Sequence, residues 1–310
     1  MNLLHMKYAV EVSKTKSISK AADNLFMGQP NLSRAIKELE ESLGIIIFER
    51  SSKGIRVTDA GEEFLQYARR ILNQVDELES LYREGHRCRQ RFSLSAPRAG
   101  YIAEAFAAFT SEIRKTESAE FFFRETDSMH TIDNVCGGEF RLGIVRYPDA
   151  YEDYFAQTFA AKNLHCESVI AFASQLLVSK RSSLAEKRNV CGEDLQDHIE
   201  VIYDNPCIPL PPADAKRDPK RTFFTVSTDK HIHVHDRGSQ LALLHANPDT
   251  FMWVTPMPHK LLEKYQLVQR PFFGAPKYRD VLITRKDYTL TDTDEKFISV
   301  LKQSVRRCFS

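Results

Sequence analysis

The sequence predicts an α/β protein that opens with a winged helix-turn-helix and continues through one long helix. Three patterns indicate this fold. Residues 1–58 contain short helical periods that end in a hairpin pattern, and residues 59–87 hold one helical period without a proline. From about Arg91 onward, strand-like and helix-like runs alternate, which is typical of an α/β architecture. The length of 310 residues suits about two domains.

The composition is that of an ordinary globular protein. Hydrophobic residues make up 42% and charged residues 27%, and the formal net charge is +1. A disordered chain would have fewer apolar residues and a larger net charge. The sequence contains no apolar run near the ~18 residues that a membrane span needs, and no basic and apolar leader at its N-terminus. We therefore expect a cytoplasmic protein that does not bind a membrane.

The first two helical patterns precede a turn. One face of the first pattern carries apolar side chains at helical spacing, namely Leu4, Tyr8 and Val12. Either Ser17 or Ser19 can cap the second pattern, which runs over residues 20–25 and contains two alanines that permit close packing. The sequence therefore predicts two short helices before residue 26.

A third helix is predicted to begin at Gln29 and to end at Gly44. The preceding turn is residues 26–28, and Pro30 stands in the first helical turn, where a missing N–H costs nothing. Its core face consists of Leu32, Ile36, Leu39 and Leu43. Two helices joined by a three-residue turn that contains glycine form a helix-turn-helix, here at about residues 18–37.

The outward face of this third helix carries polar side chains near its N-terminus. They are Gln29, Asn31, Ser33, Arg34 and Lys37. Such side chains hydrogen-bond base edges or phosphates, although the exposed face of any helix is polar. A hairpin follows, with strands at 45–48 and 55–58 and a tip at 51–54, and it adds a basic wing beside the helix. The presence of this wing favours a DNA-recognition role for the polar face of the helix over a face that is merely exposed to solvent.

Several sequence blocks in residues 1–87 share the order and spacing of a known family. They are Ser19–Leu25, Gln29–Ile36, Leu39-Glu40, Leu43-Gly44, Phe48–Arg50 and Val57–Gly61. Through these blocks the chain resembles the LysR-type transcriptional regulators. The resemblance implies that residues 1–58 bind DNA, with contacts from Gln29, Pro30, Asn31, Ser33, Arg34, Lys37, Arg50, Ser52 and Lys53. Gly28 departs from the family, which usually has a serine there that caps the helix and touches phosphate.

The long helix is expected to pair with a second copy of itself. Apolar residues recur at spacings of four and three: Phe64, Ala68, Ile71, Val75, Leu78 and Tyr82. Heptad spacing favours a partner helix, whereas Leu65 and Leu72 widen the stripe as in a helix that lies on its own domain. The resemblance implies a linker helix over residues 59–88 that forms a homodimer, or a homotetramer built from such dimers.

Residues 89–310 alternate predicted strands and helices. The strands are 92–95, 120–125, 141–147, 169–177, 199–203 and 223–227, of which 120–125 is expected to be buried. The helices are 102–113, 129–136, 239–245 and 299–309, and the proline-rich residues 205–212 form a loop. The resemblance implies a periplasmic-binding-protein-like effector domain of two α/β subdomains. It is weaker here, since Arg141 stands where the family usually has aspartate.

Three strand-to-helix junctions are candidates for binding a small effector. They supply Ser95, Pro97, Arg98, Thr126, Ser128, Gly238, Ser239 and Gln240. Helix N-termini present unpaired N–H groups, and with hydroxyls and guanidinium groups they suit a small carboxylate. Each serine or threonine is equally explained as a helix cap. We expect these segments to converge between the two subdomains.

Other functions find less support in the sequence. A redox response through Cys191 and Cys207, or a metal response through His231, His233 and His235 on one strand face, stays an alternative. No motif of a hydrolase, a nucleotide-binding enzyme or a zinc protease is present, so we expect neither an enzyme nor a cofactor. The expected partners are operator DNA, a small-molecule effector, a second copy of the chain and RNA polymerase.

Overall fold

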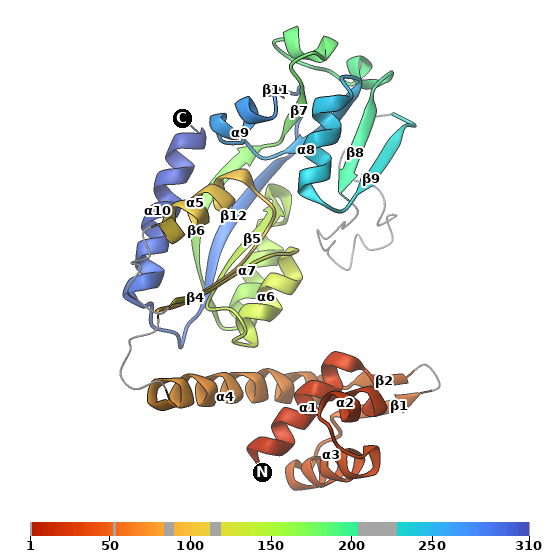
Figure 1. The fold of residues 1–310 in the computed structure, drawn as a ribbon, viewed down its shortest axis with the longest axis vertical. Helices are drawn as coiled ribbons and strands as arrows, with labels where there is room; N and C mark the ends of the chain where they lie inside the picture. The colour runs from red at the N-terminus through yellow and green to blue at the C-terminus, as the bar shows by residue number, and fades with distance from the viewer. Residues whose placement is uncertain (1, 52–53, 84–89, 112–118, 204–227, 310) are drawn as a thin grey trace. The chain divides into compact units, whose positions relative to one another are not determined.

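A computed structural model describes residues 2–51, 54–83, 90–111, 119–203 and 228–309 (Figure 1). The chain divides into two compact units. One comprises residues 1–89 together with 134–140, and the other comprises residues 90–133 and 141–310. No helix in the described parts is both long enough and apolar enough to cross a membrane.

The first unit opens with three helices, α1 (Leu3–Thr15), α2 (Ile18–Asn24) and α3 (Gln29–Leu43). The side chain of Ser17 caps α2 by accepting a hydrogen bond from the N–H of Lys20 at 3.3 Å. The second helix therefore begins two residues earlier than the sequence predicted, and the alternative cap, Ser19, lies inside it.

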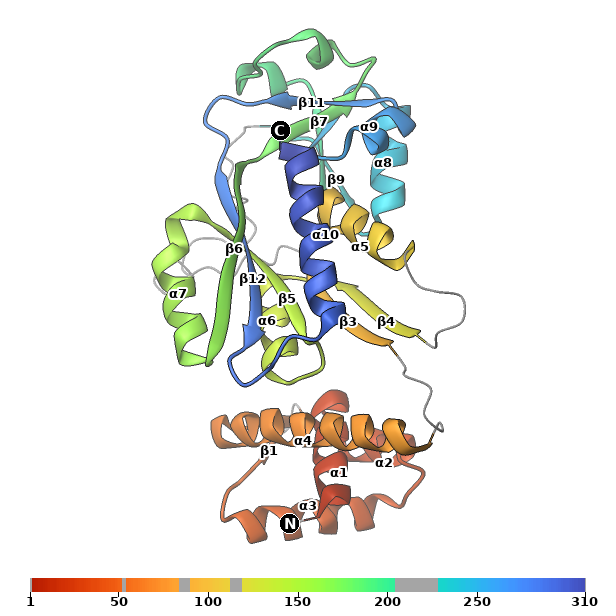
Figure 2. The same ribbon diagram turned by 90° about the vertical axis from the view of Figure 1, so that its left-hand side faces the viewer.

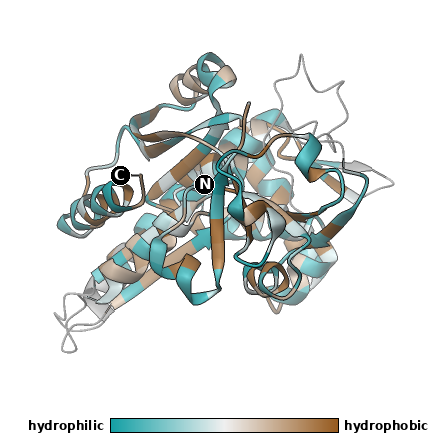
Figure 3. Cartoon of the chain, turned by 90° about the horizontal axis from the view of Figure 1, so that it is seen from above, coloured by the Kyte–Doolittle hydropathy of each residue, from teal (hydrophilic) through white to brown (hydrophobic). Residues whose placement is uncertain are grey.

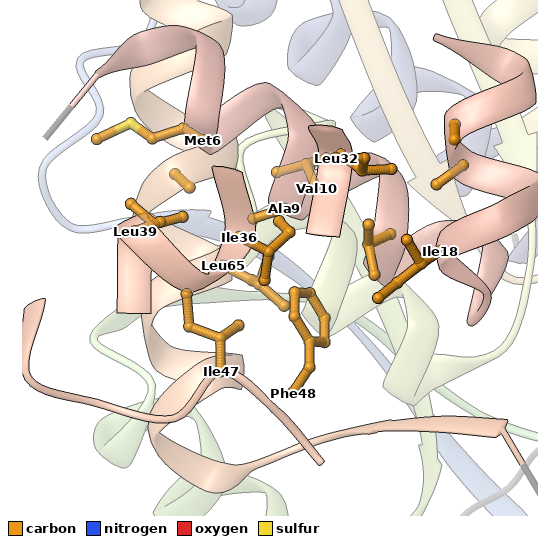
Figure 4. Packing of buried hydrophobic residues seen from close by; sticks show 14 residues of the cluster. Met6, Ala9, Val10, Ile18, Leu32, Ile36, Leu39, Ile47, Phe48 and Leu65 are labelled. Atoms are coloured by element: carbon orange, nitrogen blue, oxygen red, sulfur yellow. The ribbon is translucent and has the colours of Figure 1, made fainter. Parts of the chain in front are cut away.

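The core of this unit gathers side chains from all three helices and from the long helix that follows (Figure 4). On α1 the buried residues are Met6, Ala9, Val10 and Val12. Leu4, which starts the apolar spacing in the sequence, is 49% exposed and lies outside this core. Each step of four residues advances the helical angle by ~40° beyond a full turn, so a residue two such steps before Val12 lies off the buried face.

The wing is a two-stranded antiparallel hairpin of β1 (Phe48–Ser51) and β2 (Gly54–Val57). Its first strand begins later than predicted, because the N–H groups of Ile47 and Phe48 donate to Glu40 Oε1 on α3, at 2.7 and 3.0 Å. These bonds fix the chain against α3 before the strand begins. The tip residues, 52 and 53, lie outside the described residues.

The long helix α4 (Asp59–Arg83) packs against α1. Leu65 and Ala68 are fully buried in the shared core, and Ile71 packs at its edge. Leu78, further along the predicted heptad, is 55% exposed in the single chain. The N-terminal half of the helix thus lies on its own unit, and pairing of the C-terminal half with a second copy stays a prediction.

The first sheet of the second unit has the strand order β4-β3-β5-β12-β6. Its strands are β3 (Gln90–Ala96), β4 (Ala119–Glu125), β5 (Leu142–Pro148), β6 (Leu164–Ala173) and β12 (Lys277–Arg285). Strand β3 is parallel to β4 and β5, whereas β12 is antiparallel to β5 and β6. Helices α5 (Gly100–Ser111) and α10 (Asp292–Phe309) cover one face, and α6 (Ser128–Cys136) and α7 (Glu152–Ala161) lie on the other (Figure 2).

The second sheet has the order β11-β7-β10-β8-β9, with α8 (Arg237–Ala246) and α9 (His259–Lys264) packed on it. Its strands are β7 (Gln175–Ser179), β8 (Ile199–Tyr203), β9 (His231–Val234), β10 (Thr250–Val254) and β11 (Leu267–Pro271). The described residues of this unit also include short 3-10 helices at Asp149–Tyr151, Ser183–Glu186 and Glu193–Leu195. In Figure 3, which colours the chain by hydropathy, brown hydrophobic segments alternate with teal hydrophilic ones along the chain. A winged helix-turn-helix, a long helix and two α/β subdomains are all present, so the predicted fold class is confirmed.

Two predicted strands differ from the structure. The run 120–125 is not buried, because β4 is an edge strand and Phe122 is 53% exposed. The run 169–177 is two strands in different sheets, separated at Ser174, whose N–H donates to the carbonyl of Pro276 at 3.1 Å. An apolar run shows that a segment is buried or paired, but not where the chain changes sheets.

The closing helix α10 begins at Asp292, seven residues before the predicted start, because Thr291 and Asp294 cap it reciprocally. Asp294 Oδ2 accepts from the N–H of Thr291 at 2.9 Å, and Thr291 Oγ1 accepts from the N–H of Asp294 at 3.3 Å. The predicted strand 223–227 and the proline-rich loop 205–212 lie outside the described residues.

Candidate nucleic-acid interface and ligand site

Helix α3 separates an apolar from a polar face. Leu32 and Leu39 are fully buried, and Ile36 is nearly so. The exposed residues include most of the predicted contacts on this helix: Gln29, Pro30, Asn31, Arg34 and Lys37. Ser33 is half-buried, and Lys37 Nζ lies 3.6 Å from Glu41 Oε1 in an exposed pair. The helix therefore presents amide and guanidinium donors from its N-terminal half.

The N-terminus of α3 has no side-chain cap. Its N-cap, Gly28, has φ −70° and ψ 134° and makes no side-chain hydrogen bond. A Cβ atom at this position would meet Asn31 Nδ2 and Pro30 Cδ at 3.8 Å, which is ordinary van der Waals contact. The N–H of Asn31 donates to the carbonyl of Gly28 at 3.0 Å, and a serine side chain at position 28 would fit as a second acceptor for the first turn.

The wing joins the end of α1. The N–H of Ile55 donates to the carbonyl of Lys16 at 3.4 Å, and Lys16 itself has a left-handed backbone with φ 51°. Lys16 and the wing residue Arg56 are both exposed. Sequence reasoning missed this pair, because only the folded hairpin brings the end of α1 to the wing. The side chain of Arg50, and Ser52 and Lys53, lie outside the described residues.

Arg98 connects the two subdomains of the second unit. It follows β3, and its guanidinium donates to Gln240 Oε1 at 3.4 Å and to the carbonyl of His235 at 3.2 Å. The same guanidinium lies 3.7 Å from the ring centre of Tyr203. Arg98 and Gln240, both predicted ligand residues, are therefore in contact although they are 142 positions apart.

Glu125 joins two arginines at this junction. Its Oε2 atom lies 3.3 Å from Arg98 Nε, and its Oε1 atom lies 3.4 Å from Arg237 Nη1. Burial lowers the pKa of Arg237, since a charged guanidinium is poorly solvated there. Arg237 belongs to one of the predicted junctions, whereas Glu125 was not singled out from the sequence, because the pairing of the two exists only between folded subdomains.

A third arginine is held by a buried carboxylate. Arg146 donates to Asp280 through Nε at 2.7 Å and through Nη2 at 2.6 Å, and its Nη1 reaches the carbonyl of Arg98 at 3.3 Å. Tyr101 Oη donates to Asp280 at 2.5 Å. Burial and then the neighbouring carboxylate raise the pKa of Tyr101 well above its ordinary value, so its hydroxyl keeps the proton.

The junction has the chemistry to bind an anion. Three guanidiniums meet two partly or fully buried carboxylates, Glu125 and Asp280, while Asp236 beside Arg98 is exposed. A carboxylate ligand can accept hydrogen bonds from Arg98 and Arg237 in addition to Glu125, or in its place. Such charge-assisted bonds are stronger when they are shielded from water.

The remaining predicted ligand residues have internal partners or lie at the surface. Ser95 Oγ is 3.2 Å from Thr131 Oγ1, and Ser128 Oγ donates to the carbonyl of Arg146 at 2.5 Å. Pro97 is buried and Thr126 is half-buried. Gly238 and Ser239 lie exposed in the first turn of α8, where Asp236 is the cap.

The redox and metal alternatives find no support in the described residues. His231, His233 and His235 are exposed on β9 or just after it, and His231 lies 3.7 Å from Glu200. Within the described part of the chain, no three metal-ligating side chains come together. Cys191 Sγ donates to Asp194 at 3.3 Å, whereas Cys207 lies outside the described residues.

Comparison with known proteins agrees with both units. Residues 3–62 match the family described as "Bacterial regulatory helix-turn-helix protein, lysR family". The HTH-type transcriptional regulator AlsR of Bacillus subtilis (strain 168) is 28% identical over 202 residues, which are 64% of this chain and 62% of AlsR. The match thus spans less than two thirds of that relative.

Two solved structures show the same fold over nearly the whole chain. CbnR in complex with its target DNA has a TM-score of 0.55 and 18% identity, covering 98% of this chain and 100% of CbnR. LysG of Corynebacterium glutamicum with bound effector Arg has a TM-score of 0.56 and 13% identity, covering 99% of this chain and 98% of LysG. The helix-turn-helix of this chain is thus similar to that of the LysR family of bacterial regulatory proteins, and its fold over nearly the whole length is that of the two solved structures.

Proposed function

We propose that this protein is a sequence-specific DNA-binding transcriptional regulator whose DNA binding is modulated by a small anionic effector. The observation that carries the proposal is the division of α3, with exposed Gln29, Asn31 and Arg34 opposite buried Leu32 and Leu39. A helix built in this way inserts its polar N-terminal half into the major groove. The complex of CbnR with its target DNA supports the same use of this fold.

The polar side chains of α3 suit direct readout of bases. The Arg34 guanidinium pairs with the O6 and N7 acceptors of guanine, and the amides of Gln29 and Asn31 pair with adenine. Lys16 and Arg56, together with the predicted wing contacts, bind phosphates and fix the register of the helix in the groove.

The regulator acts as a homodimer, or as a homotetramer of two such dimers. Residues 1–58 form the DNA-binding domain, residues 59–88 the linker and residues 89–310 the effector domain. Leu78 and its heptad neighbours pair two α4 helices, so that two DNA-binding domains reach half-sites about one helical turn apart. DNA and RNA polymerase are cytoplasmic partners in this scheme.

The effector binds where Arg98, Arg237 and Gln240 meet. Its carboxylate accepts from the two guanidiniums and joins or displaces Glu125 between the subdomains. A ligand that prefers one arrangement of the subdomains changes DNA affinity by the ratio of its affinities for the two arrangements. The structure of LysG with bound effector Arg supports a ligand in this fold.

Selection from a randomised duplex pool tests the proposal. The full-length chain should enrich a sequence with two half-sites. Excess unrelated duplex should compete poorly for the protein, because the affinity for a specific site is typically ~10³–10⁷-fold higher than the affinity for non-specific DNA. Small carboxylates added to the enriched complex should shift its dissociation constant. Enrichment of no sequence would contradict the DNA-binding function, and indifference to every carboxylate would contradict the effector class alone.

A further inference from the structure

Phe26 is an apolar ring fully exposed in the turn of the helix-turn-helix. The Phe26 residue is 96% exposed. Among the exposed large hydrophobic residues in the described parts of the chain, this is the highest value. Leu25 and Met27, the residues on either side, pack against the core of the first unit. The turn thus directs its two flanking side chains inward and the ring between them outward.

The backbone of Phe26 is in the left-handed region, with φ 52°. Hydrogen bonds hold it there, from the N–H of Phe26 to the carbonyl of Asp23 at 3.1 Å and from the N–H of Met27 to the carbonyl of Ala22 at 3.0 Å. A bulky residue is disfavoured in this conformation, and glycine or asparagine would form the same turn at less cost. Neither packing nor turn geometry within the unit therefore explains a phenylalanine.

The location of the ring indicates what covers it. Phe26 lies two residues before Gly28, the N-cap of α3, and close in sequence to the exposed Gln29 and Pro30. When the N-terminus of a recognition helix enters the major groove, the turn before it comes to the edge of the same groove. The apolar group displayed there is the C5 methyl of thymine, which phenylalanine side chains contact.

Building on the proposed DNA-binding function, we propose that Phe26 recognises the C5 methyl group of one thymine in each half-site. The contact removes the ring and the methyl from water at once, and it discriminates thymine from cytosine and from uracil. Phe26 thus adds an apolar specificity contact beside the polar contacts of α3.

Replacing single thymines by deoxyuridine removes only the methyl group and tests this directly. The probe is the duplex that the wild-type full-length chain enriches from a randomised pool, with each thymine replaced in turn. At one position per half-site, the wild-type affinity should fall roughly fourfold, the factor that corresponds to one methylene-sized apolar group. Phe26→Ala should bind the thymine and uracil duplexes equally well at that position. Ile46→Ala, which truncates another exposed apolar residue of the same unit (63% exposed), should keep the wild-type sensitivity.

Phe26→Gly separates loss of the ring from damage to the fold. Glycine accepts the left-handed turn, so this variant should unfold no earlier than the wild type and should still lose the uracil sensitivity. Wild-type uracil sensitivity in both Phe26 variants would overturn the proposal. Equal losses of affinity by the Phe26 variants, relative to the wild type, on the thymine and uracil duplexes would overturn it too, since the ring would then contact the sugar-phosphate backbone. Both outcomes leave the proposed function intact, whereas enrichment of no sequence by the wild type defeats the function itself.

Discussion

Gly28→Ser gives α3 a side-chain cap and should stabilise the first unit. The backbone at Gly28 already has the extended conformation of an N-cap, and a Cβ atom there meets nothing closer than 3.8 Å. The substitution thus adds a hydroxyl that accepts from a first-turn N–H without steric cost.

The magnitude follows from what each residue supplies at this position. Serine exceeds glycine at an N-cap by only a few tenths of a kcal/mol, whereas alanine is worse than serine by about 1 kcal/mol. Gly28→Ala is the matched control, because it adds the Cβ atom without an acceptor. The two variants should therefore differ by about 1 kcal/mol, or roughly 4–8 °C in the midpoint of a unit of this size.

Two spectroscopic signals separate the units. On heating, far-UV circular dichroism of the full chain reports the helices of both units, whereas the fluorescence of the single tryptophan, Trp253, reports the second unit alone, so a helical transition that the tryptophan does not follow belongs to the first unit. The helical transition should move up for Gly28→Ser and down for Gly28→Ala, while the tryptophan transition stays in place. Equal stability of the two variants would refute the reasoning, because the hydroxyl would then cap nothing.

Four further results are expected. Arg34→Ala should weaken binding to the enriched duplex by ~1–3 kcal/mol in a gel-shift titration, whereas Lys14→Ala should mainly lower the salt dependence of the binding constant. Equal effects of the two substitutions would mean that Arg34 does not contact bases in the groove. Leu78→Asp should reduce the particle size in light scattering without unfolding the chain, because this side chain is exposed in the single copy, and an unchanged size would mean that α4 does not pair there. Arg98→Met should abolish the response of DNA binding to carboxylates, while DNA affinity without ligand stays near that of the wild type. A normal response would mean that the effector does not bind at Arg98. Burial raises the pKa of Glu200 to about 7 from 4.5, so the neutral form is favoured in the fold and stability falls as pH rises through this range, by on the order of 3 kcal/mol. Glu200→Gln should remove that decline, as urea midpoints measured across the range would show, and a decline that persists would place its origin in another group.

Local patterns in the sequence were most informative where a helix carries both its own core face and its own caps. The position of α3 followed from Gly28, Pro30 and Gly44, and its buried stripe followed from the spacing of Leu32, Ile36 and Leu39. Each of these signals depends on residues within a few turns of one another. For the same reason the polar face of α3 could be predicted as the surface opposite that stripe.

Elements that depend on distant partners were predicted less well. The run 169–177 gave no sign that Ser174 separates two sheets, and the run 120–125 gave no sign that β4 lies at an edge. Hydrophobic periodicity reports that a strand is paired, but its neighbour is chosen by chain segments far away in sequence. The ligand junction is similar, since Arg98 and Gln240 were predicted individually while the pairing of Glu125 with Arg237 was not.

The helix-turn-helix, the long helix, the α/β character of residues 89–310 and the polar residues that α3 displays could all be predicted from local sequence patterns. The folded chain was needed to learn which residues of α1 are buried, that the wing joins Lys16, and that three guanidiniums meet two carboxylates between the subdomains. It also decided that Phe26 points away from the core. The physical reason is that periodicity and capping act over a few residues along the chain. Exposure and charge pairing are instead set by whichever remote segments the fold brings alongside.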